Sequence, residues 1–335
     1  MRKIIFCFFA LFSLFFAYGE ISFYCPDKII PGDPFKIVVY QAESGEDISG
    51  GLYTLAGKRL TEAASFPLRL NRNIEVDIIL LGVPCFLSSD EYLLRIFWKE
   101  NNSSCCIERK IKLSKRSFVS EDIKLDRANT VILTKPDPRK AEERREFNKI
   151  LGVFDVKAVF CDECFVFPVK NFVETSFYGD RRVFLYDDGK SSRSIHYGLD
   201  MASDTGTPVR APADGRVVYA KERIVTGNSV IIEHLPGVFS IYFHMDSLKV
   251  KKGDMVSRGR LIGTVGSTGL STGSHLHWQI NISGVPVEPK TLLKAPLIDK
   301  SRIMSRISSL SSGELTDWFC NAVDEVLHTS DDTKN

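Results

Sequence analysis

The sequence has no surplus of charge of either sign, because 44 lysines and arginines face 42 aspartates and glutamates among its 335 residues. A chain without a basic surplus has no long-range field for nucleic acid, so nucleic acid is not an expected partner. Proline is modest at 14 residues and 44% of the residues are hydrophobic, which excludes a disordered or collagen-like chain. The length predicts about two domains, each with its own core.

Near the N-terminus, the apolar run is too short for a membrane span. It covers residues 4–16 after two basic residues, whereas a span needs about 20 apolar residues. Residues 17–19 form a small-x-small cleavage pattern, so residues 1–19 are predicted to be a signal peptide. An uncleaved anchor is the alternative. We therefore expect an exported protein of the periplasm or cell envelope, with no stable membrane span after cleavage.

Histidine is absent from residues 21–117, and no other cluster of chemically reactive residues occurs there. Short runs rich in β-branched and aromatic residues, such as 35–40, 76–81 and 92–98, alternate with glycine- and proline-containing turns. This spacing predicts a small antiparallel β-sandwich, an Ig-like accessory domain over residues 20–117. Such a domain could bind an envelope protein partner.

The remaining chain is predicted in three parts, which makes the whole protein mainly β. Residues 118–164 read as a linker with a helix at 138–151, which should pack beside the domain that follows. Residues 165–292 lack crossover helices, so an antiparallel sheet is favoured. The tail, 293–335, has a clean apolar stripe that predicts an amphipathic helix at 313–328.

Cysteine gives no clear chemical signal. Cys161 and Cys164 have the spacing of a redox or zinc motif, but no second pair completes a four-sulfur site. We expect a local disulfide or two structural thiols.

Five of the six histidines lie between residues 196 and 277. The first begins the segment His196-Tyr197-Gly198-Leu199-Asp200, with an imidazole and a carboxylate four residues apart. Nearby glycine, proline and valine favour a loop or strand edge over a helix. In either geometry both groups can reach one metal ion.

A second segment contains two histidines in alternation, His275-Leu276-His277. The pattern predicts a strand with His275, His277 and Gln279 on one face and apolar residues toward the core. Two imidazoles about 7 Å apart along a strand can serve one site, where one binds a metal and the other reaches a bound water.

A third segment places His244 in another predicted strand. Alternation predicts His244 and Tyr242 on the face opposite Ile241 and Phe243, so that His244 points into the same cleft. His234, by contrast, is predicted to be structural, because the residues on its strand face are apolar.

Six motifs follow one another in order: Gly179-Asp180-Arg181, His196-Tyr197-Gly198-Leu199-Asp200, Gly206-Thr207-Pro208-Val209, Ala211-Pro212-Ala213-Asp214-Gly215, Gly266-Ser267-Thr268-Gly269 and His275-Leu276-His277. This series resembles the lysostaphin/LytM-type zinc metallopeptidases over roughly residues 165–290. The family's FGxR pattern corresponds to Tyr178-Gly179-Asp180-Arg181. The resemblance implies the antiparallel β-sheet metallopeptidase fold of that family.

By this resemblance, His196, Asp200 and His277 are the ligands of one Zn²⁺ per chain, and His244 and His275 are the catalytic histidines. Two imidazoles and one carboxylate leave a fourth position open, as in catalytic zinc sites. Together with the export predicted from residues 1–19, the resemblance implies an exported zinc metalloendopeptidase that hydrolyses peptide cross-links of bacterial peptidoglycan through a metal-activated water. The sequence does not assign base and acid between His244 and His275.

Two alternative functions from other classes of protein stay open. A catalytically silent envelope protein of the same fold could activate another cell-wall hydrolase. Motifs such as 211–215 also look like those of lipoyl or biotinyl carriers and of the glucose-specific phosphocarrier, although the predicted export and the histidine set oppose a carrier.

Overall fold

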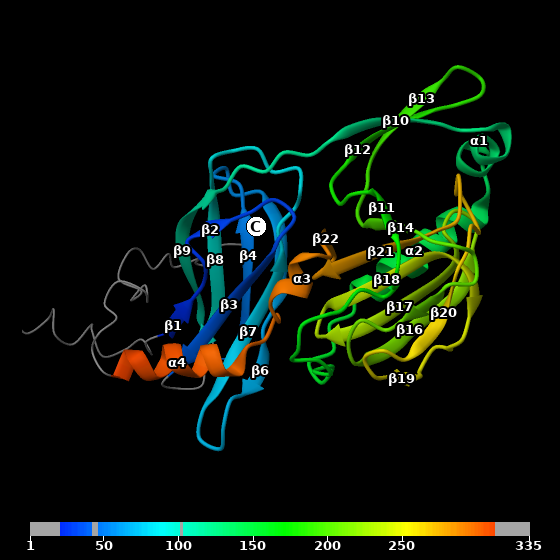
Figure 1. The fold of residues 1–335 in the computed structure, drawn as a ribbon. Helices are drawn as coiled ribbons and strands as arrows, with labels where there is room; N and C mark the ends of the chain where they lie inside the picture. The colour runs from blue at the N-terminus through cyan, green and yellow to red at the C-terminus, as the bar shows by residue number, and fades with distance from the viewer. Residues whose placement is uncertain (1–20, 42–45, 101–102, 312–335) are drawn as a thin grey trace, which may run out of the picture.

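The computed structural model describes residues 21–41, 46–100 and 103–311, and its fold is mainly β, as the sequence predicts (Figure 1). The predicted signal peptide and the predicted helix 313–328 lie outside the described residues. A helix that the sequence did not indicate, α4 (Lys300–Ser311), lies along the N-terminal sheet. In the described part of the chain, no helix has both the length and the apolar character that crossing a bilayer requires.

The N-terminal part is the predicted β-sandwich. One sheet has the order β1-β3-β7-β6 and the other has the order β2-β9-β8-β4-β5. Alternate side chains of the two sheets meet in one core, for example Ile37 and Ile79 against Leu94 and Ile96. The strands are β1 (Ile21–Tyr24), β2 (Lys28–Ile29), β3 (Pro34–Gln41), β4 (Glu46–Tyr53), β5 (Arg59–Ala64), β6 (Phe66–Arg69), β7 (Glu75–Gly82), β8 (Glu91–Glu100) and β9 (Ser103–Leu113).

Strand β7 is buried on both faces. Because successive side chains of a strand point to opposite faces, Ile79 and Leu81 fill the sandwich core, while Ile78 and Leu80 join a second core with the large sheet of the C-terminal half. Full burial of such a side chain contributes about 1.5–3 kcal/mol. The sandwich therefore shares a core with the rest of the chain.

The predicted linker contains more regular structure than its sequence indicates. Strand β10 (Ser120–Lys124) pairs in parallel with β12 (Arg181–Leu185), which pairs with β13 (Ser191–Ile195). Helix α1 (Arg127–Thr134) follows, and α2 (Pro138–Leu151) coincides with the helix predicted at 138–151. Strand β10 was missed because it has a single apolar residue, Ile123, which gives no usable alternation.

Helix α2 packs on the face of the large sheet that carries Phe243, beside the domain that follows it, as the sequence predicts. Its Phe147, Ile150 and Leu151 lie against a cluster that includes Ile231 and Phe239. Two charged residues of α2 add polar contacts, because Glu146 forms an ion pair with Lys221 of the sheet at 2.7 Å and Glu143 accepts from the Ile224 N–H at 3.0 Å.

The large sheet has ten strands, and all its pairings are antiparallel, as the sequence predicts. Its main order is β11-β14-β21-β18-β17-β16-β19, and a short helix, α3 (Thr291–Lys294), follows its last strand. The strands are β11 (Val173–Ser176), β14 (Leu199–Ala202), β15 (Pro208–Arg210), β16 (Gly215–Arg223), β17 (Gly227–Leu235), β18 (Val238–Leu248), β19 (Met255–Val256), β20 (Leu261–Val265), β21 (His275–Ile282) and β22 (Val285–Val287).

The sandwich and the large sheet meet at a junction around Gly32. Its carbonyl accepts from the Glu288 backbone N–H at 2.7 Å, and Arg116 forms an ion pair with the Glu288 carboxylate at 2.6 Å. Gly32 has φ of +85°, and a Cβ there would lie 2.3 Å from the Tyr178 ring. Only glycine tolerates both this backbone conformation and this close approach.

We expect Gly32→Ala to destabilise the protein more than Gly57→Ala. Both glycines have similar positive φ, +85° and +80°, but the nearest side-chain atom to a Cβ at Gly57 is 3.8 Å away. The control therefore carries only the backbone cost, and Gly32→Ala adds overpacking of about 1–3 kcal/mol. Urea denaturation of both variants measures the difference. Equal losses of stability in the two variants would show that the Tyr178 ring moves away from the added methyl group without a cost in free energy.

Candidate metal and catalytic site

Two of the predicted ligands lie directly opposite each other in the large sheet. In the antiparallel pair β14–β21, Asp200 is the register partner of His277. Side chains of such partners share one face of the sheet with Cβ atoms about 4.5–5.5 Å apart. On the other side of β21, His277 is opposite Phe243 of β18, and their rings stack 5.1 Å apart. The register thus sets one edge of the site.

The third predicted ligand, His196, precedes β14 in a loop that passes directly over His277. A Cβ at Gly198 would lie 2.7 Å from the His277 ring and 2.6 Å from the Trp278 carbonyl. Glycine is therefore required for the loop to approach closely enough. As a result, His196 comes beside Asp200 and His277, and all three residues are buried.

The three side chains direct one atom each toward a common point. His196 Nε2 lies 3.0 Å from Asp200 Oδ1 and 2.9 Å from His277 Nδ1, and His277 Nδ1 lies 2.9 Å from Asp200 Oδ1. These are the residues that could hold a metal ion in the described part of the chain. Tetrahedral zinc with bonds of about 2.0–2.1 Å places its ligand atoms roughly 3.3 Å apart, so the triangle is close to the required size.

The outward hydrogen bonds fix the tautomers of both imidazoles. His196 Nδ1 donates to the Phe177 carbonyl at 2.9 Å, and His277 Nε2 lies 3.3 Å from the Gln279 amide oxygen. Because the outer nitrogens donate, the inner nitrogens of neutral rings carry lone pairs. Two lone pairs and a carboxylate oxygen thus face one another, and a cation satisfies all three.

The carboxylate of Asp200 stays ionised in this setting. Burial raises its pKa, but in the metal-free cluster the interactions with protonated His196 and His277 outweigh burial and hold the pKa well below its usual value. Its second oxygen, Oδ2, accepts from Arg182 Nη2 at 2.7 Å. The donor set therefore contains one anion and two neutral rings, a set typical of catalytic zinc sites.

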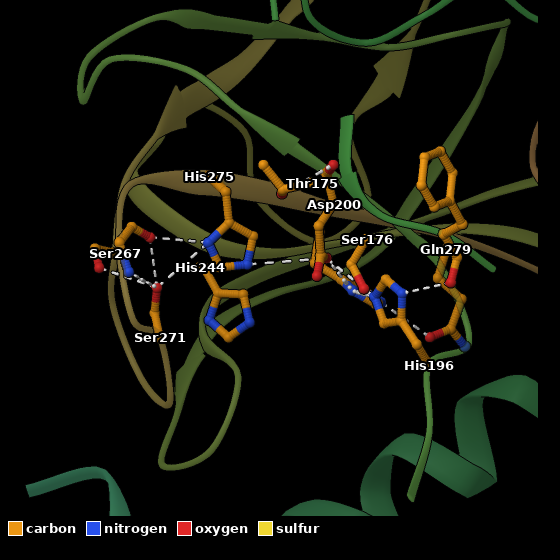
Figure 2. Close-up of polar contacts among 12 residues, drawn as sticks. Thr175, Ser176, His196, Asp200, His244, Ser267, Ser271, His275 and Gln279 are labelled. Atoms are coloured by element: carbon orange, nitrogen blue, oxygen red, sulfur yellow. Dashed lines mark hydrogen bonds and ion pairs between the residues drawn. The ribbon is translucent and has the colours of Figure 1, made fainter. Parts of the chain in front are cut away.

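The two predicted catalytic histidines lie together beside this cluster (Figure 2). His275 Nε2 is 3.8 Å from Asp200 Oδ1, and the His244 and His275 rings are 4.8 Å apart. His275 Nδ1 donates to the Gly273 carbonyl and His244 Nδ1 donates to the Thr268 carbonyl. In each neutral ring Nε2 is therefore a proton acceptor. Burial lowers the pKa of His244 to about 3, so that ring is neutral near pH 7.

Simple alternation did not place His244 correctly. Tyr242 lies in the apolar core opposite Trp278, whereas Phe243 and His244 both face the site. Strand β18 has an irregularity there, and His244 has φ of +61°. A β-bulge re-aims one side chain, and a non-glycine residue in this conformation costs about 1–3 kcal/mol. The prediction that His244 and Tyr242 share a face was therefore wrong, although His244 does reach the cleft.

The strand β21 pattern is confirmed. Leu276 and Trp278 lie in the large apolar core, while His275, His277 and Gln279 line the opposite face. Gln279 also donates to Asn281 Oδ1 at 2.6 Å, which turns its amide oxygen toward His277.

The cluster lies in a groove with a cavity of about 250 Å³. Arg182 is the only lysine or arginine among its lining residues. The predicted linker also contributes to this wall, and Asn129 of α1 donates to the Ser271 carbonyl at 3.2 Å across the groove. Beside the histidines and Asp200, the lining residues are Ile123, Leu125, Asn129, Arg182, Phe184, Ile195, Tyr197, Val225, Thr226, Phe243, Leu270, Ser271, Thr272 and Gln279.

His234 and the pair Cys161 and Cys164, which the sequence analysis did not assign to the site, lie outside it. His234 is fully buried, and its Nδ1 donates to the Asp214 carbonyl at 2.7 Å while Nε2 contacts Ser240 Oγ at 2.7 Å. Cys161 and Cys164 are free, so of the two alternatives the structure has thiols rather than a disulfide.

Sequence reasoning missed Arg182, Glu121 and the linker residues of the groove. The FGxR-like pattern drew attention to Arg181, but Arg181 donates to the Cys85 carbonyl at the sandwich junction. The alternation of strand β12 allows one of the two neighbouring arginines to reach the site, and no local signal shows which one does.

Comparison with known proteins agrees with this geometry. Residues 194–289 match the family described as Peptidase family M23. Over 95 residues the chain is 45% identical to the DD-carboxypeptidase/endopeptidase Mpg of Neisseria meningitidis, covering 28% of this chain and 22% of Mpg. Over 92 residues it is 44% identical to the peptidoglycan DD-endopeptidase ShyA of Vibrio cholerae, covering 28% of this chain and 21% of ShyA. The match thus spans about a fifth of these relatives.

A crystal structure of a Pseudomonas aeruginosa protein named as a peptidase M23 has a similar fold over more of the chain. Its TM-score is 0.54 at 21% identity, with 79% of this chain and 95% of that chain covered. At this identity the likeness concerns the fold alone. The fold and the matched residues together define a peptidase-type domain. Residues 194–289 thus match a Peptidase family M23 domain.

We expect His277→Ala to abolish zinc binding, because it removes one of three converging donor atoms. His234→Gln is the matched control, since His234 is also a buried histidine of the same sheet but has no contact with the cluster. Zinc content per chain, measured by elemental analysis after dialysis, should be one for the wild type and the control. A zinc content of one in His277→Ala would contradict the assigned ligand set.

We expect the stability of the protein to decrease as the pH is lowered, because the buried imidazole of His234 resists protonation. Burial lowers the pKa of this imidazole to about 4 in the folded protein, whereas an unfolded chain has about 6.5. As pH falls from 6.5 toward 4, the unfolded state takes up a proton that the folded state refuses, so stability is lost, by about 2 kcal/mol at pH 5. Denaturation of metal-free wild type and His234→Gln at pH 7 and pH 5 isolates this effect. An equal pH dependence in both proteins would exclude it.

Proposed function

We propose that this protein is an exported zinc metalloendopeptidase that hydrolyses peptide cross-links of bacterial peptidoglycan, with one Zn²⁺ per chain. The observation that carries the proposal is the convergence of His196, Asp200 and His277 on one point, with His244 and His275 beside it. The M23 match and the names of relatives such as ShyA support the class of reaction and of substrate. Export follows from the sequence pattern of residues 1–19 and stays a prediction.

The three converging residues would hold the metal. A bound zinc ion would polarise the scissile carbonyl and make water a better nucleophile near neutral pH. Gln279 and the Phe177 carbonyl keep the two imidazoles in the ligand tautomer, because each accepts from an outer nitrogen. The groove excludes bulk water from one side of this cluster through Phe243, which stacks on His277.

The two remaining histidines would move the proton. Nε2 of His244 or His275 accepts a proton from the attacking water as its oxygen bonds to the peptide carbon. The resulting imidazolium stabilises the negative charge on the carbonyl oxygen and then donates its proton to the leaving amine as the C–N bond breaks. The rings are 4.8 Å apart, so both can reach one reacting group.

We expect zinc-loaded protein to release cross-link-cleaved peptides from purified peptidoglycan, and His275→Ala to lose most of this turnover while it keeps its zinc. General acid–base groups contribute typically about 10²–10⁴-fold to rate. Mass spectrometry of the released fragments identifies the bond that is cut. Full activity of His275→Ala would overturn the mechanism.

Zinc-loaded wild type that releases nothing would instead favour the alternative function, activation of another cell-wall hydrolase. A role of the sandwich in binding an envelope protein stays a prediction.

A further inference from the structure

The outer oxygen of Asp200 is held by an arginine that no sequence motif assigned. Arg182 Nη2 donates to Asp200 Oδ2 at 2.7 Å, while Oδ1 faces the imidazoles of His196 and His277. A charge-assisted hydrogen bond of this length is among the stronger ones in proteins. Because Oδ2 is engaged in this way, Asp200 offers Oδ1 alone to the cluster.

Arg182 is itself held from its other side by the predicted linker. Its Nε donates to Glu121 Oε1 at 2.8 Å, and Ser176 Oγ donates to the same oxygen at 2.8 Å. Glu121 belongs to β10, and the parallel register of β10 on β12 makes Glu121 the direct partner of Arg182. The contact therefore exists only while β10 is paired with β12.

The neighbouring arginine provides a contrast within the same strand. Arg181 donates to the Cys85 and Gly179 carbonyls and has no bond to the cluster. Its role is to join the sandwich, at Cys85, to the three-stranded sheet of β10, β12 and β13. The side chain of Arg182 is 16% exposed and lines the groove. The two neighbouring arginines therefore contact different parts of the protein.

We propose that Arg182 is a positioning residue of the metal site and that Glu121 anchors it. Strand β10 then supports metal binding through Glu121. Partners that orient a metal ligand typically change metal affinity or activity by about 10- to 100-fold. The charges of Arg182 and Glu121 offset each other, so the pair orients the Asp200 carboxylate without adding net charge. The inference rests on the proposed function only in requiring that the cluster binds zinc.

The test is the dissociation constant for zinc, measured by competition with a chromophoric chelator, in the full chain. We expect Arg182→Gln to weaken zinc binding at least about tenfold, Glu121→Gln to weaken it less, and Arg182→Lys to restore part of the loss. Arg193→Gln, an exposed arginine of β13, and Glu174→Gln, which breaks the Lys290 ion pair of β11, are the matched controls. Both should bind zinc as the wild type does.

Thermal unfolding of the metal-free proteins separates positioning from a purely structural role. Weaker zinc binding at unchanged metal-free stability supports the inference. If Arg182→Gln does not fold, Glu121→Gln decides, because it keeps the size and shape of the side chain.

Unchanged zinc affinity in the Arg182 and Glu121 variants overturns the inference, even if turnover falls, because Arg182 would then act on the substrate. This result leaves the proposed function intact. A wild type that binds no zinc overturns both the inference and the proposed function. Zinc-binding wild type that does not cleave peptidoglycan contradicts only the proposed function.

Discussion

The antiparallel register of β14, β21 and β18 is the constraint on which the site depends. It places Asp200 opposite His277 and His277 opposite Phe243, so one row across three strands supplies a carboxylate, an imidazole and an aromatic wall. A slip of one residue would turn every one of these side chains to the other face. The large apolar core on that other face, with Leu276 and Trp278, makes such a slip costly.

Hydrogen bonds directed away from the cluster give it its chemical character. Each of the four imidazoles places one nitrogen within hydrogen-bonding distance of an oxygen acceptor outside the cluster, and three of these acceptors are backbone carbonyls. A backbone carbonyl cannot donate, so it forces the ring nitrogen that meets it to carry the hydrogen. The lone pairs then face inward, toward Asp200. His196 and His277 are candidate ligands, and His244 and His275 are candidate proton acceptors, because the two pairs differ in their position relative to Asp200.

The N-terminal sandwich and the linker belong to the same structural unit as the M23 domain. Strand β7 has one face in the sandwich core and the other in the core of the large sheet, which explains its unbroken apolar run. The linker adds β10 to the small sheet above the groove, and α1 reaches the loop around Ser271. Elements far apart in the sequence therefore support the residues that face the cluster.

The sequence by itself determined the mainly β fold, the sandwich, helix 138–151 and the identities of His196, Asp200, His244, His275 and His277 as site candidates. These features rest on local patterns, namely alternation, turn residues, caps and short motifs. Only the tertiary structure decided that a bulge turns His244 into the cleft beside Phe243, because a bulge depends on the pairing of β18 with its neighbours. Only the tertiary structure decided that Arg182, and not Arg181, reaches Asp200. Which face of β12 meets the site depends on strands that lie next to it in space but not in sequence.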